Sequence, residues 1–196
     1  MQQIDFREAV GAITKLALNL ADQTPNPVIL IDGRAGSGKS TLASQLRDAV
    51  FQAGEPAPTL IQMDDLYPGW EGLRAGSHYL NLNILDKLSK GKPASWQLWD
   101  WEIGQRGRAS EPGNGWREYS GGNILIIEGC GSLSRHSREL AQLAIWVEAD
   151  RDVRRARWLE RDGEKFKDYF DIWAAQEDEF YQTEKSKELA DLWVSN

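Results

Sequence analysis

The residues of this chain best suited to chemistry lie in one short run that contains three glycines and ends in lysine and serine. Residues 33–40 read GRAGSGKS, which matches the Walker A pattern G-x-x-x-x-G-K-[ST]. Glycines let consecutive backbone N–H groups turn toward an anion, the lysine reaches the β- and γ-phosphates, and the serine hydroxyl ligates Mg²⁺. The run therefore predicts a site for the triphosphate of a nucleotide, formed by Gly33, Arg34, Ala35, Gly36, Ser37, Gly38, Lys39, Ser40 and Thr41.

The segments on either side of this run are those that a phosphate-binding loop requires. Four apolar residues, 28–31, precede it and are typical of a strand buried on both faces of a parallel sheet. After it, Leu42, Leu46 and Ala49 recur at helical spacing, so a helix beginning at Lys39 would point its positive dipole end at the phosphates. This context favours a functional loop over a glycine-rich turn that matches by chance.

Three carboxylates follow predicted buried strands and qualify as partners of the triphosphate. Asp64 and Asp65 follow the predicted strand 59–63, and Glu128 ends the predicted strand 123–128. At the carboxyl ends of parallel strands, a carboxylate can accept the proton of an attacking hydroxyl or hold Mg²⁺. If strand geometry persists, only one of the two adjacent aspartates faces the phosphates. The alternatives are a solvated aspartate pair that opens a turn, and a glutamate that caps the turn after its strand.

Three arginines are spaced i, i+3, i+7 and share one face of a predicted helix that Asp150 caps: Arg154, Arg157 and Arg161. Charge on a transferring phosphoryl group is stabilised by cations, and a lid helix at about 151–165 could carry them to it. The alternative is a solvated helix on which these arginines pair with neighbouring carboxylates.

Residues 67–122 differ in character from the rest of the chain and are expected to form an insertion that covers the substrate. Five of the nine tryptophans lie in this segment, together with a predicted helix at about 78–90 and a polar loop, 104–122, expected to be its most mobile part. Planar side chains can stack on an acceptor and arginines can bind its oxygen atoms. The expected acceptor contacts are Asp65, Tyr67, Trp99, Trp101, Arg106 and Arg108. For the tryptophans at 99 and 101, the alternative is the insertion's own core.

Length and composition narrow the class of protein. The chain has 196 residues, enough for one α/β domain over 1–196, and its net charge of −7 argues against partners such as nucleic acid or an anionic membrane. The single cysteine, Cys130, excludes an internal disulfide, and its flanking glycines favour a small buried side chain over a reactive thiol. We recognise neither a signal peptide nor an apolar run of membrane-spanning length, so a cytoplasmic protein is expected. With two histidines, His78 and His136, a zinc site is not expected.

The remaining pattern alternates strands with helices. Helical spacing is found over 4–20 and after Asp150, and further apolar strands are predicted over 143–148 and 192–194. Strands that alternate with helices form right-handed β-α-β units around a parallel sheet. The predicted fold is a three-layer α/β/α domain with a central parallel sheet and a helical, tryptophan-rich insertion as substrate lid.

Together these motifs resemble the uridine kinase and phosphoribulokinase group of P-loop kinases. The resemblance covers the phosphate loop, the acidic segment Met63-Asp64-Asp65-Leu66-Tyr67, Ile127-Glu128-Gly129, the arginine-rich segment that ends at Asp162, and the segments 88–93 and 190–194. It implies a P-loop fold and an ATP- and Mg²⁺-dependent transfer of a phosphoryl group to a hydroxyl of a small polar metabolite, with a nucleoside as the expected acceptor. It further implies that Asp64 is the general base, that Ser40, Asp64 and Glu128 hold magnesium, and that Lys39, Arg154, Arg157 and Arg161 act on ATP.

Two departures from that group bear on the acceptor. Its uridine kinases carry a Tyr-Asp-Phe-like segment followed by a His and an Arg that hold the nucleoside. This chain has Trp99-Asp100-Trp101, with Arg106 or Arg108 downstream and no His between, and it is short for a uridine kinase. Phosphoryl transfer is therefore better supported than uridine as the acceptor.

Two other functions remain open at this point. The acceptor could be a nucleoside monophosphate, whose phosphate Arg106, Arg108 and Arg117 would bind. The chain could instead be an ATP-binding or ATPase module that acts through a protein partner docked on the tryptophan-rich insertion. The sequence leaves the oligomeric state open between monomer and homodimer.

Overall fold

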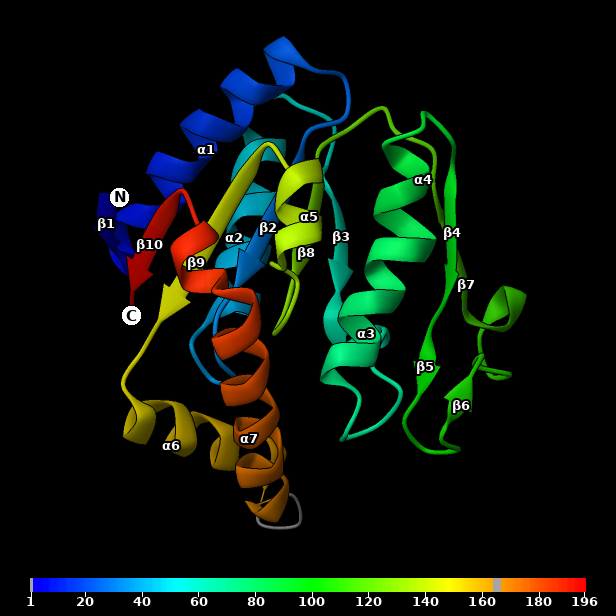
Figure 1. Ribbon diagram of the computed structural model, residues 1–196. Helices are drawn as coiled ribbons and strands as arrows, with labels where there is room; N and C mark the ends of the chain where they lie inside the picture. Colours follow the sequence, from blue (N-terminus) through cyan, green and yellow to red (C-terminus); the bar gives the residue numbers. More distant parts are fainter. Residues whose placement is uncertain (1, 164–166) are drawn as a thin grey trace.

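A parallel sheet of six strands forms the centre of the molecule (Figure 1). The computed structural model describes residues 2–163 and 167–196. In spatial order the strands are β1-β10-β9-β2-β8-β3, and every neighbouring pair is parallel, so their carboxyl ends share one edge of the sheet. The strands are β1 Gln2–Asp5, β2 Val28–Asp32, β3 Thr59–Gln62, β8 Leu125–Glu128, β9 Leu143–Glu148 and β10 Leu192–Ser195.

Helices cover both faces of this sheet, because its central strands are apolar on both sides and every residue of β2 is buried. The helices are α1 Phe6–Gln23, α2 Lys39–Gln52, α3 Leu73–Leu80, α5 Arg135–Leu140, α7 Lys167–Glu184 and α8 Ser186–Leu189. One core cluster joins α1 and α2 to one face, and a second cluster joins α3 and α7 to the other face through alternate residues of the same strands. The predicted three-layer α/β/α P-loop fold is confirmed.

The N-terminus differs from the prediction. Helical spacing predicts a helix over 4–20, but Ile4 lies in β1, which pairs with β10, and α1 begins at Phe6. Asp5 ends the strand and caps the helix, since its carboxylate accepts a hydrogen bond from the Arg7 N–H at 2.9 Å. A four-residue edge strand is too short to show an alternating pattern, and the helical repeat that begins at Phe6 does not include Ile4.

The segment 67–122 is more regular than predicted. Its helical part begins at Leu73, before the predicted start near 78, and the segment 104–122 contains short strands where a loop is predicted. Beyond α3 its elements are the π-helical turn η2 Asn81–Leu85, α4 Asp86–Leu88, β4 Ala94–Gln97, β5 Trp99–Asp100, β6 Gln105–Arg106, the 3-10 turn η3 Pro112–Gly115 and β7 Trp116–Tyr119. β4 pairs with β7 and β5 with β6, both antiparallel. These strands have two to four residues each and depend on cross-strand partners, so the sequence pattern does not predict them.

The predicted lid helix is α6, Arg151–Asp162. Asp150 caps it as predicted, because its carboxylate accepts a hydrogen bond from the Asp152 N–H at 2.8 Å. The end of the expected lid, 164–165, lies outside the described residues. In Figure 1, α6 and α7 lie together beyond the carboxyl edge of the sheet. Within the described ranges, no helix combines the length and the apolar character needed to cross a membrane.

Candidate active site

A cavity of about 690 Å³ opens at the carboxyl edge of the sheet. Ligands of open parallel sheets bind at this edge. The loop half of the cavity is lined by Ala35, Gly36, Gly38, Lys39, Ser40 and Thr41, and its aromatic half by Tyr67, Trp70, Trp101, Trp158 and Trp173. Between the two halves and around their rim lie Phe6, Asp64, Glu128, Gly129, Cys130, Arg157, Arg161 and Asn196.

The phosphate loop has the conformation that its glycines permit. Gly33 and Gly36 have φ of 145° and 77°, which side chains with a Cβ rarely adopt. A Cβ on Gly33 would lie 2.2 Å from the Val147 carbonyl oxygen, and one on Gly36 would lie 2.5 Å from the Arg154 carbonyl oxygen. α2 begins at Lys39 as predicted, which brings its N-terminal N–H groups and its dipole to the cavity. This half of the cavity is therefore suited to an anion.

Three predicted loop contacts, Gly33, Arg34 and Ser37, are not among the described residues that line the cavity. Ser37 is fully buried. The Arg34 side chain turns to α7, where its Nη2 atom lies 2.6 Å from the Asp178 carboxylate. These three residues therefore belong to the loop but contribute to its structure and not to the cavity wall.

Lys39 lines the loop half of the cavity. Its ammonium group is buried with the rest of the side chain, and it donates a hydrogen bond to the Arg34 carbonyl oxygen at 3.0 Å. Burial alone would lower the pKa of Lys39, but the Cys130 sulfur and the carboxyls of Glu128 and Glu177 raise it above its usual value. Lys39 is therefore a cation, as the binding of a triphosphate requires.

The predicted metal ligands meet beside Lys39. The buried Glu128 carboxylate accepts hydrogen bonds from the Ser40 hydroxyl and, at 3.3 Å, from the Gln62 side-chain amide. Burial raises the pKa of Glu128, and the Lys39 ammonium opposes that rise. No three His, Cys, Asp or Glu side chains of the described residues form a metal cage of their own. Hydroxyl and carboxylate oxygens of this kind fit a Mg²⁺ ion that completes its shell with phosphate and water oxygens.

The two adjacent aspartates have different surroundings, because β3 ends in a 3-10 turn at Met63–Asp65. Asp64 lines the cavity, and its backbone carbonyl accepts a hydrogen bond from the Trp101 indole N–H at 2.9 Å. The Asp65 carboxylate accepts a hydrogen bond from Arg108 at 3.0 Å, inside the insertion. Burial raises the pKa of Asp65, and Arg108 opposes the rise. Of the pair, Asp64 is the one placed to act on a group in the cavity.

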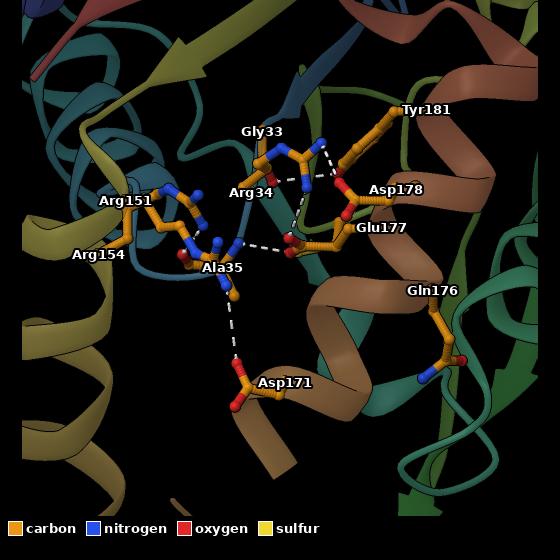
Figure 2. A network of polar contacts seen from close by, with 12 residues as sticks. Gly33, Arg34, Ala35, Arg151, Arg154, Asp171, Gln176, Glu177, Asp178 and Tyr181 are labelled. Carbon is orange, nitrogen blue, oxygen red and sulfur yellow. Dashed lines mark hydrogen bonds and ion pairs between the residues drawn. The ribbon is translucent and has the colours of Figure 1, made fainter. Parts of the chain in front are cut away.

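The three lid arginines divide into two positions. Arg157 and Arg161 line the cavity. Arg157 donates a hydrogen bond to the Gly36 carbonyl oxygen at 3.3 Å, and the Arg161 guanidinium lies 5.4 Å from the ring centroid of a tryptophan on the same helix. Arg154 is buried and donates a hydrogen bond to the Ala35 carbonyl oxygen at 3.2 Å (Figure 2). Arg154, expected to contact ATP, thus holds the phosphate loop instead of lining the cavity.

Trp70 lies at the centre of the aromatic half. Its ring centroid is 5.1 Å from that of Trp101, 5.8 Å from that of Trp158 and 6.4 Å from that of Trp173, and it stacks on Tyr169 at 4.6 Å. Trp70 and Trp101 belong to the insertion, whereas the other three rings belong to α6 and α7. The insertion and the two helices therefore meet in one aromatic cluster beside Asp64.

The remaining predicted acceptor contacts, Trp99, Arg106 and Arg108, are also not among the described lining residues of the cavity. Arg106 donates hydrogen bonds to two backbone carbonyls at 2.9 and 3.0 Å, and its guanidinium lies 3.5 Å from the Tyr79 ring centroid. Arg108 donates hydrogen bonds to the Trp99 carbonyl and to the carboxylates of Asp65 and Glu111. In this structure Arg106 and Arg108 stabilise the conformation of the insertion.

Two buried carboxylates beside the phosphate loop have no counterpart among the predicted site residues. Asp32 ends β2 and accepts hydrogen bonds from three backbone N–H groups and from the Tyr181 hydroxyl, and its burial raises its pKa to about 6. A charged residue at the end of an apolar strand is a signal in the sequence, as for Glu128. Glu177 of α7 accepts a hydrogen bond from the Ala35 N–H at 2.6 Å. Nothing in the sequence distinguishes it from the acidic residues around it.

Comparison with solved structures confirms the resemblance at the level of the fold. A protein described as a possible uridine kinase from Bacillus stearothermophilus is similar over 96% of this chain and 98% of its own, with a TM-score of 0.66 and 20% identity. A proposed fructose transport system kinase from Silicibacter sp. TM1040 is similar over 92% of this chain and 97% of its own, with a TM-score of 0.54 and 18% identity. No protein-family model matches the sequence, and neither does a curated protein. The chain therefore shares its overall fold with these two proteins.

Proposed function

We propose that this protein is an ATP- and Mg²⁺-dependent kinase that transfers the γ-phosphoryl group of ATP to a hydroxyl of a small polar metabolite, with a nucleoside as the acceptor. One observation carries the proposal: the carboxylate-bearing Asp64 lines the same cavity as Lys39 and Ser40 of the phosphate loop. A triphosphate on the loop would thus face a residue able to accept a proton. The proposal keeps the division expected from the sequence, one domain over 1–196 with 67–122 as its substrate-binding insertion.

The residues of the cavity divide the reaction among them. The loop amides and Lys39 bind the phosphates, and a Mg²⁺ ion held by Ser40 and Glu128 would neutralise phosphate charge. Asp64 accepts the proton of the acceptor hydroxyl, whose oxygen forms a bond to the γ-phosphorus while the bond to the ADP oxygen breaks. Arg157 and Arg161 stabilise the charge on the transferring group.

The aromatic half favours an acceptor with a planar, uncharged body. Tryptophan rings bind such a body by stacking. A nucleoside monophosphate would need a second cationic site, and the three arginines suggested for that role are engaged within the insertion. Arg117 and Arg108 pair with Glu111, Arg108 also pairs with Asp65, and Arg106 binds backbone carbonyls. A nucleoside is therefore the better-supported acceptor.

The decisive experiment measures ADP release from ATP with a panel of nucleosides, nucleoside monophosphates and other polar alcohols. We expect ADP release to depend on an acceptor and to be abolished in Lys39→Ala. In Asp64→Asn, kcat should fall by about 10²–10⁴-fold while ATP still binds, because a general base contributes about that much. Asp65→Asn is the matched control, and it should retain most of the activity since Asp65 lies outside the cavity lining.

Two outcomes would change this assignment. Acceptor-dependent activity that persists in Asp64→Asn and disappears in Asp65→Asn would move the base to the neighbouring residue. ATP hydrolysis that ignores every small acceptor and rises with an added protein would instead favour a nucleotide-binding module that acts through a partner.

A further inference from the structure

Two consecutive helices hold the backbone of Ala35 from opposite sides (Figure 2). The Ala35 N–H donates a hydrogen bond to Oε1 of Glu177 on α7 at 2.6 Å, and the Ala35 carbonyl oxygen accepts one from Nη1 of Arg154 on α6 at 3.2 Å. Both side chains are almost fully buried, with residue exposures of 1% for Glu177 and 6% for Arg154. α6 and α7 therefore both bind the phosphate loop at Ala35, one through each of its backbone polar groups.

The other contacts of the Glu177 carboxylate are with a loop residue or with a residue that touches the loop lysine. The Cys130 thiol lies 3.2 Å from Oε1, and Arg34 Nη1 lies 3.5 Å from Oε2. The same thiol sulfur lies 3.6 Å from the Lys39 ammonium. A buried carboxylate is costly unless it is paired and hydrogen-bonded, and the partners of Glu177 lie in the phosphate loop or touch its lysine.

The next turn of α7 extends this attachment. Tyr181 is four residues after Glu177, so it lies on the same face of the helix. Its hydroxyl donates a hydrogen bond to Asp32 at 2.7 Å. Its ring lies 5.5 Å from the guanidinium of Arg34, and the two residues lie side by side in Figure 2. One face of α7 thus contacts the strand end that precedes the loop and the first half of the loop itself.

We propose that Glu177 is a positioning residue for nucleotide binding. Its carboxylate takes the Ala35 N–H out of the set available to phosphate and fixes this part of the loop, so that the amides from Gly36 onward face the cavity. Arg154 binds the carbonyl oxygen of the same residue, Ala35. The packing of α6 and α7 against the loop and the ordering of the loop therefore occur together. The inference rests on the proposed function, since it assumes that this loop binds the triphosphate.

The first test compares three variants by ATP affinity, thermal unfolding and kinetics. Glu177→Met keeps the length of the side chain but offers no acceptor for the Ala35 N–H, and it should raise the Kd and KM for ATP at least tenfold with a smaller change in kcat. Glu177→Gln keeps an acceptor oxygen and should restore the affinity to within about threefold of wild type, a margin of less than 1 kcal/mol. Asp178→Asn is the control: it also contacts Arg34, but its side chain is 71% exposed, and ATP affinity should not change.

The second test separates positioning from a purely structural role. Exchange of the Ala35 amide hydrogen, measured without nucleotide, should be slow in wild type and Glu177→Gln and fast in Glu177→Met. A double variant, Glu177→Met with Arg154→Met, should lose less ATP affinity than the product of the two single losses, because both residues hold Ala35.

Three results would overturn the inference: a Glu177→Met protein that melts earlier but binds ATP as well as wild type, equally slow Ala35 exchange in all variants, or losses that multiply in the double variant. A wild-type protein that binds no ATP would overturn the proposed function as well. ATP binding that is unchanged in Glu177→Met would overturn this inference alone.

Discussion

The two halves of the cavity are built in different ways. The loop half comes from one contiguous run of nine residues, 33–41, whose backbone N–H groups and glycine conformations would do most of the binding in the proposed function. The aromatic half comes from side chains that are far apart in the sequence: Trp70, Trp101, Trp158 and Trp173. A site made from backbone has a local sequence pattern, whereas a site made from distant side chains has none.

This difference should also appear in how each half tolerates substitution. The loop half depends on φ angles and close backbone approaches, which an added Cβ destroys. The aromatic half depends on buried ring area, from which one ring can be removed at a graded cost. Substitutions in the first half should therefore act on ATP and have large effects, and those in the second should act on the acceptor and have small ones.

Gly36→Ala should give the largest effect. The new Cβ would lie 2.5 Å from the Arg154 carbonyl oxygen and would force a positive φ on alanine, so the loop must move. We expect ATP affinity to fall at least a hundredfold in calorimetric titration. The matched control is Gly104→Ala in the insertion, where φ is 66° but nothing lies within 4 Å. That variant should cost about 1–2 kcal/mol of stability and leave ATP affinity unchanged. Equal ATP affinity in the two variants would contradict the phosphate-loop assignment.

Asp32 should give the next largest effect, and it concerns the support of the loop half. The pKa of Asp32 is about 6 in the folded protein and near 3.9 in an unfolded chain. Between pH 4 and 6 the folded state binds a proton that the unfolded state does not, so this carboxyl's contribution to the free energy of unfolding decreases as pH rises. The total change is about 3 kcal/mol.

Asp32→Asn measures this effect, because the substitution removes the titrating group. Chemical denaturation at several pH values should show that wild type loses about 2 kcal/mol relative to Asp32→Asn between pH 4 and 7, which is most of the total change. In Tyr181→Phe the loss should extend to higher pH, since the Tyr181 hydroxyl lowers the pKa of Asp32. If wild type gains stability relative to the asparagine variant as pH rises, the four hydrogen-bond donors outweigh burial and keep Asp32 ionised.

The same contrast explains what could be predicted from the sequence. The strand-loop-helix unit around 28–46, the strand 143–148 and the acids Asp64 and Glu128 follow from apolar runs and from where those runs stop. These features are local, since a strand buried on both faces has to be apolar throughout. The edge strand β1 and the hairpins of the insertion could not be predicted, because their pairing is set by partners far along the chain.

Side-chain direction was beyond the sequence in the same way. Among the aromatic and cationic residues of 67–122, the spacing could not tell that Trp101 lines the cavity while Arg106 and Arg108 bind groups within the insertion. For Glu177, helical position gives only the face of α7 on which it lies. The hydrogen bond that Glu177 accepts from the Ala35 N–H forms only when α7 is packed against the phosphate loop.

The smallest expected effect tests the aromatic half. Trp101 lines the cavity, packs against Trp70 and donates its indole N–H to the Asp64 carbonyl. An aromatic pair contributes about 0.5–1.5 kcal/mol, so Trp101→Ala should raise the KM for the acceptor about two- to tenfold in steady-state kinetics and leave the KM for ATP unchanged. Trp116→Ala is the matched control, because this tryptophan of the same insertion is 53% exposed and is not among the residues that line the cavity. If both variants change the acceptor KM equally, the effect comes from the stability of the insertion. If neither variant changes the acceptor KM, the acceptor binds outside the aromatic half. The inference that the acceptor has a planar body would then lose its support.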